Sequence, residues 1–324
     1  MNGQLEIVAV DIGGTNARFC RARVGGGERP ALATIRKYKV ADYPSLADCW
    51  RQFQADEGSA LPGKAAIAVA APTNRHPIKL TNSHWVIDPD ALMQELHFDR
   101  IKLVNDFEAI AHGVTALPPE NFGHLFGPER GLPQNGTITV LGPGTGLGVC
   151  VIAMVDGTPH IFATEGGHID FAASDAVEDG LLQELRKRFD HVSVERIVSG
   201  PGLNLLYQSL AALSGQDMPS ISDGDLWQAA LSGNDGLAVD ALERLCLCYG
   251  AAAGDLALAQ DAKAVVLAGS LTQRMRETVL FDQFHARFVA KGRYVDFMSD
   301  LPVFFADHPE FGLYGAAVAG AALA

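Results

Sequence analysis

Short apolar runs alternate along the chain with longer stretches in which apolar positions recur at helical spacing. Three of these runs, at residues 7–15, 138–146 and 265–270, are rich in Val, Ile and Leu and contain or end at glycines. Each predicts a buried strand followed by a turn that glycine-rich backbone makes readily. Two more apolar runs, at residues 65–70 and 101–105, predict buried strands as well.

Helices are predicted between these strands. Asp88 followed by Pro89 is a strong helix start, because Asp caps the free N–H groups of a first turn and proline fits the first helical position. Residues 200–202 are expected to interrupt an otherwise helical stretch, and residues 25–30 are expected to form a hairpin turn. Strands mixed with helices of this length indicate an α/β protein. We expect helices at 44–56, 88–96, 174–213, 236–260 and 311–323.

The 324 residues are enough for two domains, and the first two glycine turns each open one half of the chain. We therefore expect two related α/β lobes. The smaller lobe is expected to comprise residues 1–108 plus 308–324, because the final helix would return to pack on it. The larger lobe is expected to comprise residues 109–307.

Composition and charge exclude several classes of function. Hydrophobic residues make up 48% of the chain and charged residues 19%, which is typical of a globular protein rather than a disordered one. The net charge of −13 argues against an extended nucleic-acid surface, which needs clustered Lys and Arg. No apolar segment approaches the roughly 20 residues needed to span a bilayer, and no basic stretch precedes the first apolar run as in a secretory signal. We expect no nucleic-acid partner and no membrane association.

The cysteines indicate a reducing compartment. Five of them are scattered along the chain, an odd number without a disulfide pattern, which is typical of thiols in a cytoplasmic protein. Cys246 and Cys248 lie close in sequence, but no second pair accompanies them, so packing within a helix is favoured over a metal site.

The first glycine turn lies in the sequence DIGGTNAR, residues 11–18. It follows one strand and leads into another, so it is neither the glycine pattern that opens a dinucleotide-binding helix nor a P-loop. The remaining interpretation is a hairpin whose backbone N–H groups approach phosphate oxygens. Asp11 is placed where a carboxylate can hold Mg²⁺ through water. The candidate nucleotide-binding residues here are Asp11, Gly13, Gly14, Thr15 and Asn16.

A second loop repeats this chemistry at residues 142–148, with four glycines and the hydroxyl of Thr145 after a buried strand. One such loop alone is more often a tight connection than a ligand site. Two of them, each directly after a hydrophobic strand, favour phosphate binding. The candidates here are Gly142, Gly144, Thr145 and Gly146, with Gly269 in the third turn.

Asn105 and Asp106 end one predicted strand and open an apolar helix. The carboxyl end of a strand is a favoured place for chemistry in α/β folds. A kinase that acts on an alcohol needs a base to take the hydroxyl proton, and Asp106 can serve as that base. The alternative is that Asp106 merely caps the helix.

Three further polar residues have the chemistry of a sugar site. Glu165 and His168 lie in a glycine-rich loop, and Glu195 follows thirty positions after Glu165. Carboxylates, amides and imidazoles satisfy the neighbouring hydroxyls of a sugar, and a buried polar group left unpaired is costly. His168 and Glu195 also have structural alternatives. His168 alone would fit a core histidine, and Glu195 alone would fit a helix cap, because the residues from Ser193 onward resemble a helix start.

The three glycine turns resemble the phosphate-1, phosphate-2 and adenosine motifs of the actin, heat-shock chaperone and sugar kinase superfamily. They match in order and separation over most of the chain. The resemblance implies a two-lobed actin-like ATPase fold, with a ribonuclease H-like βββαβαβα core in each lobe. It also implies an active site in the interlobe cleft, which closes over ATP and a sugar.

The segments VNDF, TEGGHIDFA and VSVERIVSGPG resemble the glucose-binding elements of bacterial hexokinase-type glucokinases. The segment LTNSHW, residues 80–85, matches a further motif of that family whose role stays unassigned. The resemblance implies that Asp106 is also the general base. The glucose ligands that it implies are Asn105, Asp106, Glu165, His168 and Glu195.

The chain departs from the wider repressor and kinase family in two ways. The zinc-binding CxCGxxGCxE motif is missing, which places the chain in the metal-free glucokinase branch. The third turn reads AGS where many relatives have two or three glycines, so the adenine contact at Gly269 rests on weaker grounds than the phosphate contacts.

The expected function is ATP-dependent phosphorylation of D-glucose to D-glucose 6-phosphate, the first step of glycolysis, with ATP and Mg²⁺. One alternative is a kinase for another hexose, such as mannose, fructose or an amino sugar. Another is a non-catalytic sugar-sensing regulator, which would need a DNA-binding segment ahead of the first strand. The family resemblance also suggests a homodimer formed through the larger lobe.

Overall fold

The computed structural model describes residues 3–74, 76–80, 83–217 and 220–324. Two residues of the LTNSHW segment, Thr81 and Asn82, therefore lie outside the described residues. The chain divides into two compact units. Unit 1 comprises Met1–Asn121 and His308–Ala324, and unit 2 comprises Phe122–Asp307.

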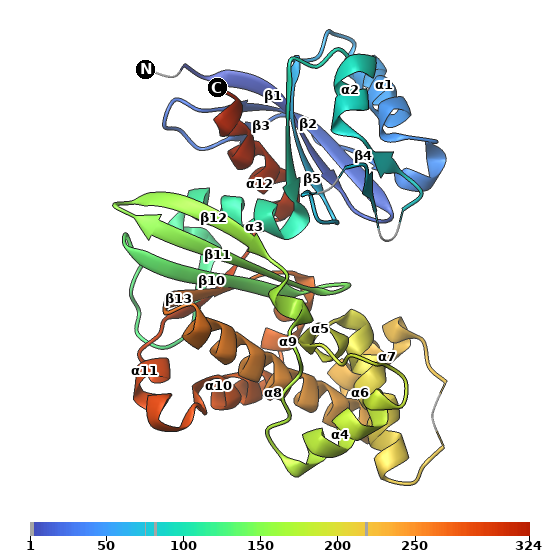
Figure 1. Cartoon of the computed structure of the whole chain (residues 1–324), viewed down its shortest axis with the longest axis vertical. Helices are drawn as coiled ribbons and strands as arrows, with labels where there is room; N and C mark the ends of the chain where they lie inside the picture. Colours follow the sequence, from blue (N-terminus) through green and yellow to red (C-terminus); the bar gives the residue numbers. More distant parts are fainter. Residues whose placement is uncertain (1–2, 75, 81–82, 218–219) are drawn as a thin grey trace. The chain divides into compact units, whose positions relative to one another are not determined.

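Unit 1 is built on a six-stranded sheet with the order β3-β2-β1-β5-β8, in which β4 also pairs with β2 (Figure 1). The first strand is antiparallel to β2 and parallel to β5, which is in turn parallel to β8. The predicted hairpin turn at residues 25–30 connects β2 to the antiparallel β3. The strands are β1 (Leu5–Ile12), β2 (Asn16–Val24), β3 (Ala31–Leu32), β4 (Arg36–Lys39), β5 (Lys64–Val69) and β8 (Arg100–Asn105), with the separate pair β6 (Ile78–Lys79) and β7 (Val86–Ile87).

Side chains of β1 alternate between two apolar layers, as the period of two in a strand requires. Val8 packs in a cluster with Trp50 of α1, whereas Ile7 packs on the other face with Leu313 of α12. By the same alternation, Asp11 lies on the face that α12 covers. The C-terminal helix thus lies against the first strand of the chain (Figure 1). The helices of unit 1 are α1 (Leu46–Glu57), α2 (Pro89–Glu95), α3 (Asp106–Ala116) and α12 (Phe311–Gly320).

The start of α2 confirms the predicted signal, because the Asp88 side chain accepts hydrogen bonds from two first-turn N–H groups. The first expected domain boundary differs from the structure, since a division after residue 108 would cut α3. Helix α3 packs directly on α12, where a Cβ added to Gly315 would meet the Ala109 carbonyl at 1.7 Å. The Tyr314 hydroxyl also donates to the carbonyl of Ala116 at 3.1 Å. These contacts keep all of α3 in unit 1.

Unit 2 repeats the strand arrangement of unit 1. Its sheet has the order β12-β11-β10-β13-β14-β9, in which an antiparallel hairpin is again followed by parallel strands. The predicted α/β fold with one core repeated in both units is therefore confirmed. The strands are β9 (Phe122–Phe126), β10 (Gly136–Pro143), β11 (Leu147–Val155), β12 (Thr158–Thr164), β13 (Ala262–Leu267) and β14 (Val303–Ala306).

The helices of unit 2 include the long predicted helix, which is α8. The helical stretch predicted at 174–213 is interrupted just before residues 200–202, because α5 ends at Ile197 and Ser199 caps α6 by accepting from the N–H of Gly202 at 3.2 Å. A further break separates α4 from α5. The α-helices are α4 (Ala176–Arg186), α5 (Val194–Ile197), α6 (Gly200–Leu213), α7 (Asp223–Ser232), α8 (Gly236–Ala259), α9 (Ser270–Arg276), α10 (Asp282–Val289) and α11 (Val295–Ser299). Short 3₁₀ helices occur at Val40–Asp42, Pro119–Asn121, Gly166–His168, Val279–Phe281, Gly292–Tyr294 and Ala321–Leu323.

A buried ionic cluster joins three helices of unit 2. Glu178 of α4 is 1% exposed and lies 3.1 Å from both Arg244 of α8 and Arg287 of α10. Asp175, at the N-cap of α4, contacts the same two guanidinium groups. The charges are paired in a water-poor region, so each one depends on its partners for compensation.

Two findings concern the chain as a whole. Over its described residues, the structure contains no helix with the length and apolar character needed to cross a membrane. All five cysteines are buried, and none of them forms a disulfide. Burial raises the pKa of Cys20 and of Cys246 to about 12, so these thiols stay protonated at neutral pH.

Candidate active site

The first glycine turn is a hairpin, as predicted. Gly13, Gly14 and Thr15 connect β1 to β2, and the N–H of Gly13 donates to the carbonyl of Asn16 at 3.0 Å. Gly14 and Thr15 are exposed at the tip. The turn thus presents a short stretch of open backbone in which N–H groups can meet a phosphate.

Asp11 lies at the base of this turn, opposite Arg18 in the register of β1 and β2. Its carboxylate is 19% exposed and lies 3.2 Å from the Arg18 guanidinium, which also contacts Glu310 at 2.9 Å. A Cβ at Gly312 would come within 2.9 Å of the Asp11 carboxylate. Helix α12 can therefore cover this carboxylate closely only because residue 312 is glycine. Burial raises the pKa of Asp11, and the positive charge of Arg18 opposes that shift.

The residues around Asp11 fit only one kind of magnesium site. Within the described part of the chain, no three or more His, Cys, Asp or Glu side chains are grouped so that they could hold a metal ion. The single carboxylate of Asp11 suits Mg²⁺ that keeps most of its water ligands and is otherwise bound by phosphate oxygens.

Asn105 is the last residue of β8 and Asp106 is the first residue of α3, and the two side chains have different roles. Asn105 is the N-cap of α3, since its side-chain oxygen accepts from the N–H groups of Phe107 at 2.8 Å and Glu108 at 3.3 Å. Glu108 completes a capping box by accepting from the N–H of Asn105 at 3.3 Å. The alternative that Asp106 is the cap is therefore wrong.

Asp106 is the first residue of α3 and lies half-buried in unit 1. Its pKa is raised to about 6, chiefly because burial disfavours the charged carboxylate. The N–H of Phe107, which donates to it at 2.8 Å, opposes the shift, and the negative charge of Asp11 adds to it. A carboxylate with this pKa is ionised at neutral pH and is more basic than an ordinary Asp, as a general base should be.

The second glycine turn repeats the first within unit 2. Gly144, Thr145 and Gly146 connect β10 to β11, and the N–H of Gly144 donates to the carbonyl of Gly146 at 2.7 Å. The N–H of Gly200, at the start of α6, donates to the carbonyl of Gly144 at 2.8 Å. Gly142 lies before this turn, buried in β10 and paired with Gly148 of β11.

Gly269 forms the third turn, between β13 and α9. It is the N-cap of α9 with φ 93°, in the region that favours glycine, and a Cβ there would lie 3.2 Å from the carbonyl oxygen of Pro143. Gly269 is therefore beside the end of β10, next to the second glycine turn.

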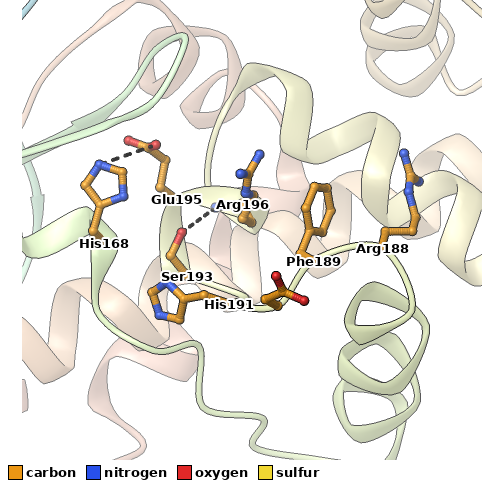
Figure 2. A pocket seen from close by; sticks show the side chains of 8 residues that line it. His168, Arg188, Phe189, His191, Ser193, Glu195 and Arg196 are labelled. Atoms are coloured by element: carbon orange, nitrogen blue, oxygen red, sulfur yellow. Dashed lines mark hydrogen bonds and ion pairs between the residues drawn. The ribbon is translucent and has the colours of Figure 1, made fainter.

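The structure brings Glu165, His168 and Glu195 together in unit 2. The Nε2 atom of His168 lies 3.8 Å from a carboxylate oxygen of Glu195 (Figure 2). It also lies 3.8 Å from a carboxylate oxygen of Glu165. His168 is 58% exposed, so the alternative of a core histidine is wrong. The predicted helix start at Ser193 is confirmed, but Ser193 and not Glu195 is the N-cap of α5, so the alternative of Glu195 as a helix cap is wrong. The Glu195 side chain is directed at His168 instead (Figure 2).

A cavity of about 460 Å³ adjoins His168 and Glu195 (Figure 2). Phe189 lies in its wall, with the guanidinium of Arg196 4.3 Å from the centre of its ring. No sequence motif marks this wall, because it is formed largely by a short loop of mixed charged and aromatic residues. The lining residues are His168, Arg188, Phe189, Asp190, His191, Ser193, Glu195 and Arg196.

A family model described as Glucokinase matches residues 8–323. A protein named glucokinase from Zymomonas mobilis is 47% identical over 97% of this chain and 97% of its own length. One from a Caulobacter strain is 37% identical over 95% of this chain and 93% of its own. A crystal structure of glucokinase from an Antarctic psychrotroph superimposes with a TM-score of 0.85 at 31% identity, covering 97% of this chain and 98% of the other. The chain therefore belongs to the glucokinase family.

Proposed function

We propose that the protein transfers the terminal phosphoryl group of ATP to the 6-hydroxyl of D-glucose, giving D-glucose 6-phosphate and ADP, the first step of glycolysis. Membership of the glucokinase family supports the reaction. The single observation that carries the mechanism is the environment of the Asp106 carboxylate. Asp106 does not cap its helix, and burial raises its pKa to about 6.

Both glycine turns would bind the phosphates of ATP through backbone N–H groups, at Gly13–Asn16 in unit 1 and Gly144–Gly146 in unit 2. The support is that the same three-residue hairpin recurs at the same place in both sheets. Gly269, beside the second turn, would contact the adenosine. Asp11 would hold a hydrated Mg²⁺, which neutralises phosphate charge when bound.

The family resemblance assigns the sugar to Asn105 and Asp106 in unit 1 and to Glu165, His168 and Glu195 in unit 2. The 6-hydroxyl oxygen forms a bond to the γ-phosphorus while the bond from that phosphorus to the β–γ bridging oxygen breaks. The hydroxyl proton passes to the Asp106 carboxylate, and ADP leaves. Asn105 donates from its amide nitrogen to the Ala71 carbonyl at 3.3 Å, which orients the amide beside Asp106.

The test is ADP release with Mg-ATP and a panel of hexoses, each against a sugar-free control. We expect strong turnover with glucose and little with mannose, fructose or glucosamine. Asp106→Asn should lower kcat by about 10²–10⁴-fold, the usual contribution of a general base. Asp42→Asn, at an exposed carboxylate of the same unit, should leave kcat unchanged. Preference for another hexose would contradict the substrate, and near-normal kcat in Asp106→Asn would contradict the base.

We also propose that the protein works in the cytoplasm, which the five buried thiols support. A homodimer stays a prediction from the family resemblance. Sedimentation of the purified protein at micromolar concentration tests it directly, and a monomer mass there would contradict it.

A further inference from the structure

Glu195 contacts two parts of unit 2 with its two carboxylate oxygens. Oε1 lies 3.8 Å from Nε2 of His168, within the group of residues assigned to the sugar. Oε2 accepts a hydrogen bond from the backbone N–H of Leu147 at 2.8 Å. Leu147 directly follows the turn of Gly144, Thr145 and Gly146. One side chain thus touches both the sugar residues and the end of the second glycine turn.

Two glycines make this contact possible. A Cβ at Gly146 would lie 2.3 Å from the Oε2 atom of Glu195, and a Cβ at Gly167 would lie 2.4 Å from the carbonyl oxygen of Leu147. The backbone of Leu147 is therefore held between the Glu195 carboxylate, at its N–H, and the loop that carries His168, at its carbonyl. The other end of the turn is held separately, by the hydrogen bond from Gly200 to Gly144.

The environment makes the bond to Leu147 a strong one. The side chain of Glu195 is 29% exposed, whereas Glu165 in the same group is 67% exposed. A hydrogen bond to a charged acceptor that is partly removed from water contributes more than a neutral one at the surface. It also fixes the direction of the N–H groups in the turn, which is what a phosphate-binding backbone requires.

We propose that Glu195 is a positioning residue for the second phosphate turn as well as a sugar contact. The inference rests on the proposed function, in which this turn binds the phosphates of the nucleotide. A sugar bound at Glu195 would stiffen the same carboxylate, so sugar occupancy would raise the affinity of the turn for nucleotide. By linkage, nucleotide would raise the affinity for sugar by the same factor.

The test measures Mg-ADP binding by calorimetry without sugar, so that loss of sugar affinity cannot affect the result. Glu195→Ala removes the acceptor and should weaken Mg-ADP binding by about tenfold. Glu195→Gln keeps a side-chain oxygen for the Leu147 N–H and should stay within about threefold of the unaltered protein. Glu165→Ala is the matched control, since it belongs to the sugar group without touching the turn, and its Mg-ADP affinity should be unchanged.

Gly146→Ala provides a second perturbation, because the added methyl group displaces the carboxylate without removing it. It should also weaken Mg-ADP binding, and it should reduce the ratio of Mg-ADP affinities measured with and without saturating glucose. Unchanged Mg-ADP affinity in either Glu195→Ala or Gly146→Ala would overturn the inference. An equal loss of Mg-ADP affinity in Glu165→Ala would also overturn the inference, because the effect would then belong to the proposed sugar ligands in general. Absence of glucose turnover in the unaltered protein would instead contradict the proposed function.

Discussion

The carboxylate of Asp106 should cost the protein stability at neutral pH. Its pKa is about 6 in the folded protein against 3.8 for an ordinary Asp, so the folded state holds the proton more tightly between these values. Stability therefore falls as the pH rises from about 4 to about 6 and is level above that range. The shift of roughly two pKa units corresponds to about 3 kcal/mol, which we reduce to about 2 kcal/mol because the side chain is partly exposed.

Asp106→Asn removes the charge and keeps a side-chain oxygen for the Phe107 N–H. The variant should unfold with a free energy about 2 kcal/mol higher than the unaltered protein at pH 7.5, and the difference should vanish near pH 4. Urea denaturation at both pH values measures it. Trp227 of unit 2 is replaced by Phe in the unaltered protein and in each variant. The buried Trp50 and Trp85 then report the unfolding of unit 1 by their fluorescence.

Asp42→Asn serves as the control, because Asp42 is an exposed carboxylate of unit 1. It should change the unfolding free energy by less than about 0.5 kcal/mol at either pH. The reasoning would be refuted if Asp106→Asn were no more stable than the unaltered protein at pH 7.5. It would also be refuted if the difference grew on acidification, since that is the behaviour of a carboxylate with a lowered pKa.

Three further predictions follow from the same contacts. The kcat/KM for glucose should rise with pH through about 6, because Asp106 loses its proton there. The residual kcat/KM of Asp106→Asn should not show this rise. A rise in kcat/KM with its midpoint below pH 5 would contradict the raised pKa. Glu178→Gln should lower the unfolding free energy of unit 2 by about 3 kcal/mol, because two partly buried arginines lose their buried charged partner. The exposed Asp240→Asn should have little effect in the same denaturation experiment. Gly315→Ala should lower the unfolding free energy by about 3 kcal/mol, and with it the melting temperature, because the added methyl group clashes with α3. Gly224→Ala should not, because the space around Gly224 is open. Equal melting temperatures of the two variants would refute the close packing of α3 on α12.

The local sequence was sufficient to predict the glycine hairpins and the long helix. The glycine hairpins at residues 13–15 and 144–146 follow from glycines placed directly after buried strands, because turn geometry depends on the few residues in the turn. The long helix α8 follows from its apolar spacing. Strand β9 was not predicted, because this short edge strand has exposed or half-buried side chains and no alternation of apolar and polar positions.

The chemistry of single residues depended on contacts that are distant in sequence. Asn105 and Asp106 are both good helix caps, and only the extended backbone of Asn105 at the end of β8 decides between them. The burial of Asp11 comes from α12, some three hundred residues later, where Gly312 permits the close approach.

The sequence by itself therefore determined the family resemblance, the two glycine turns and the residue types available for sugar and phosphate. The tertiary structure decided which of these residues act on one another. It brought His168 to Glu195, linked Glu195 to the turn at Leu147 and raised the pKa of Asp106. The physical reason is that strand and turn propensities act over a few residues, whereas burial and side-chain contacts come from packing between segments far apart in the chain.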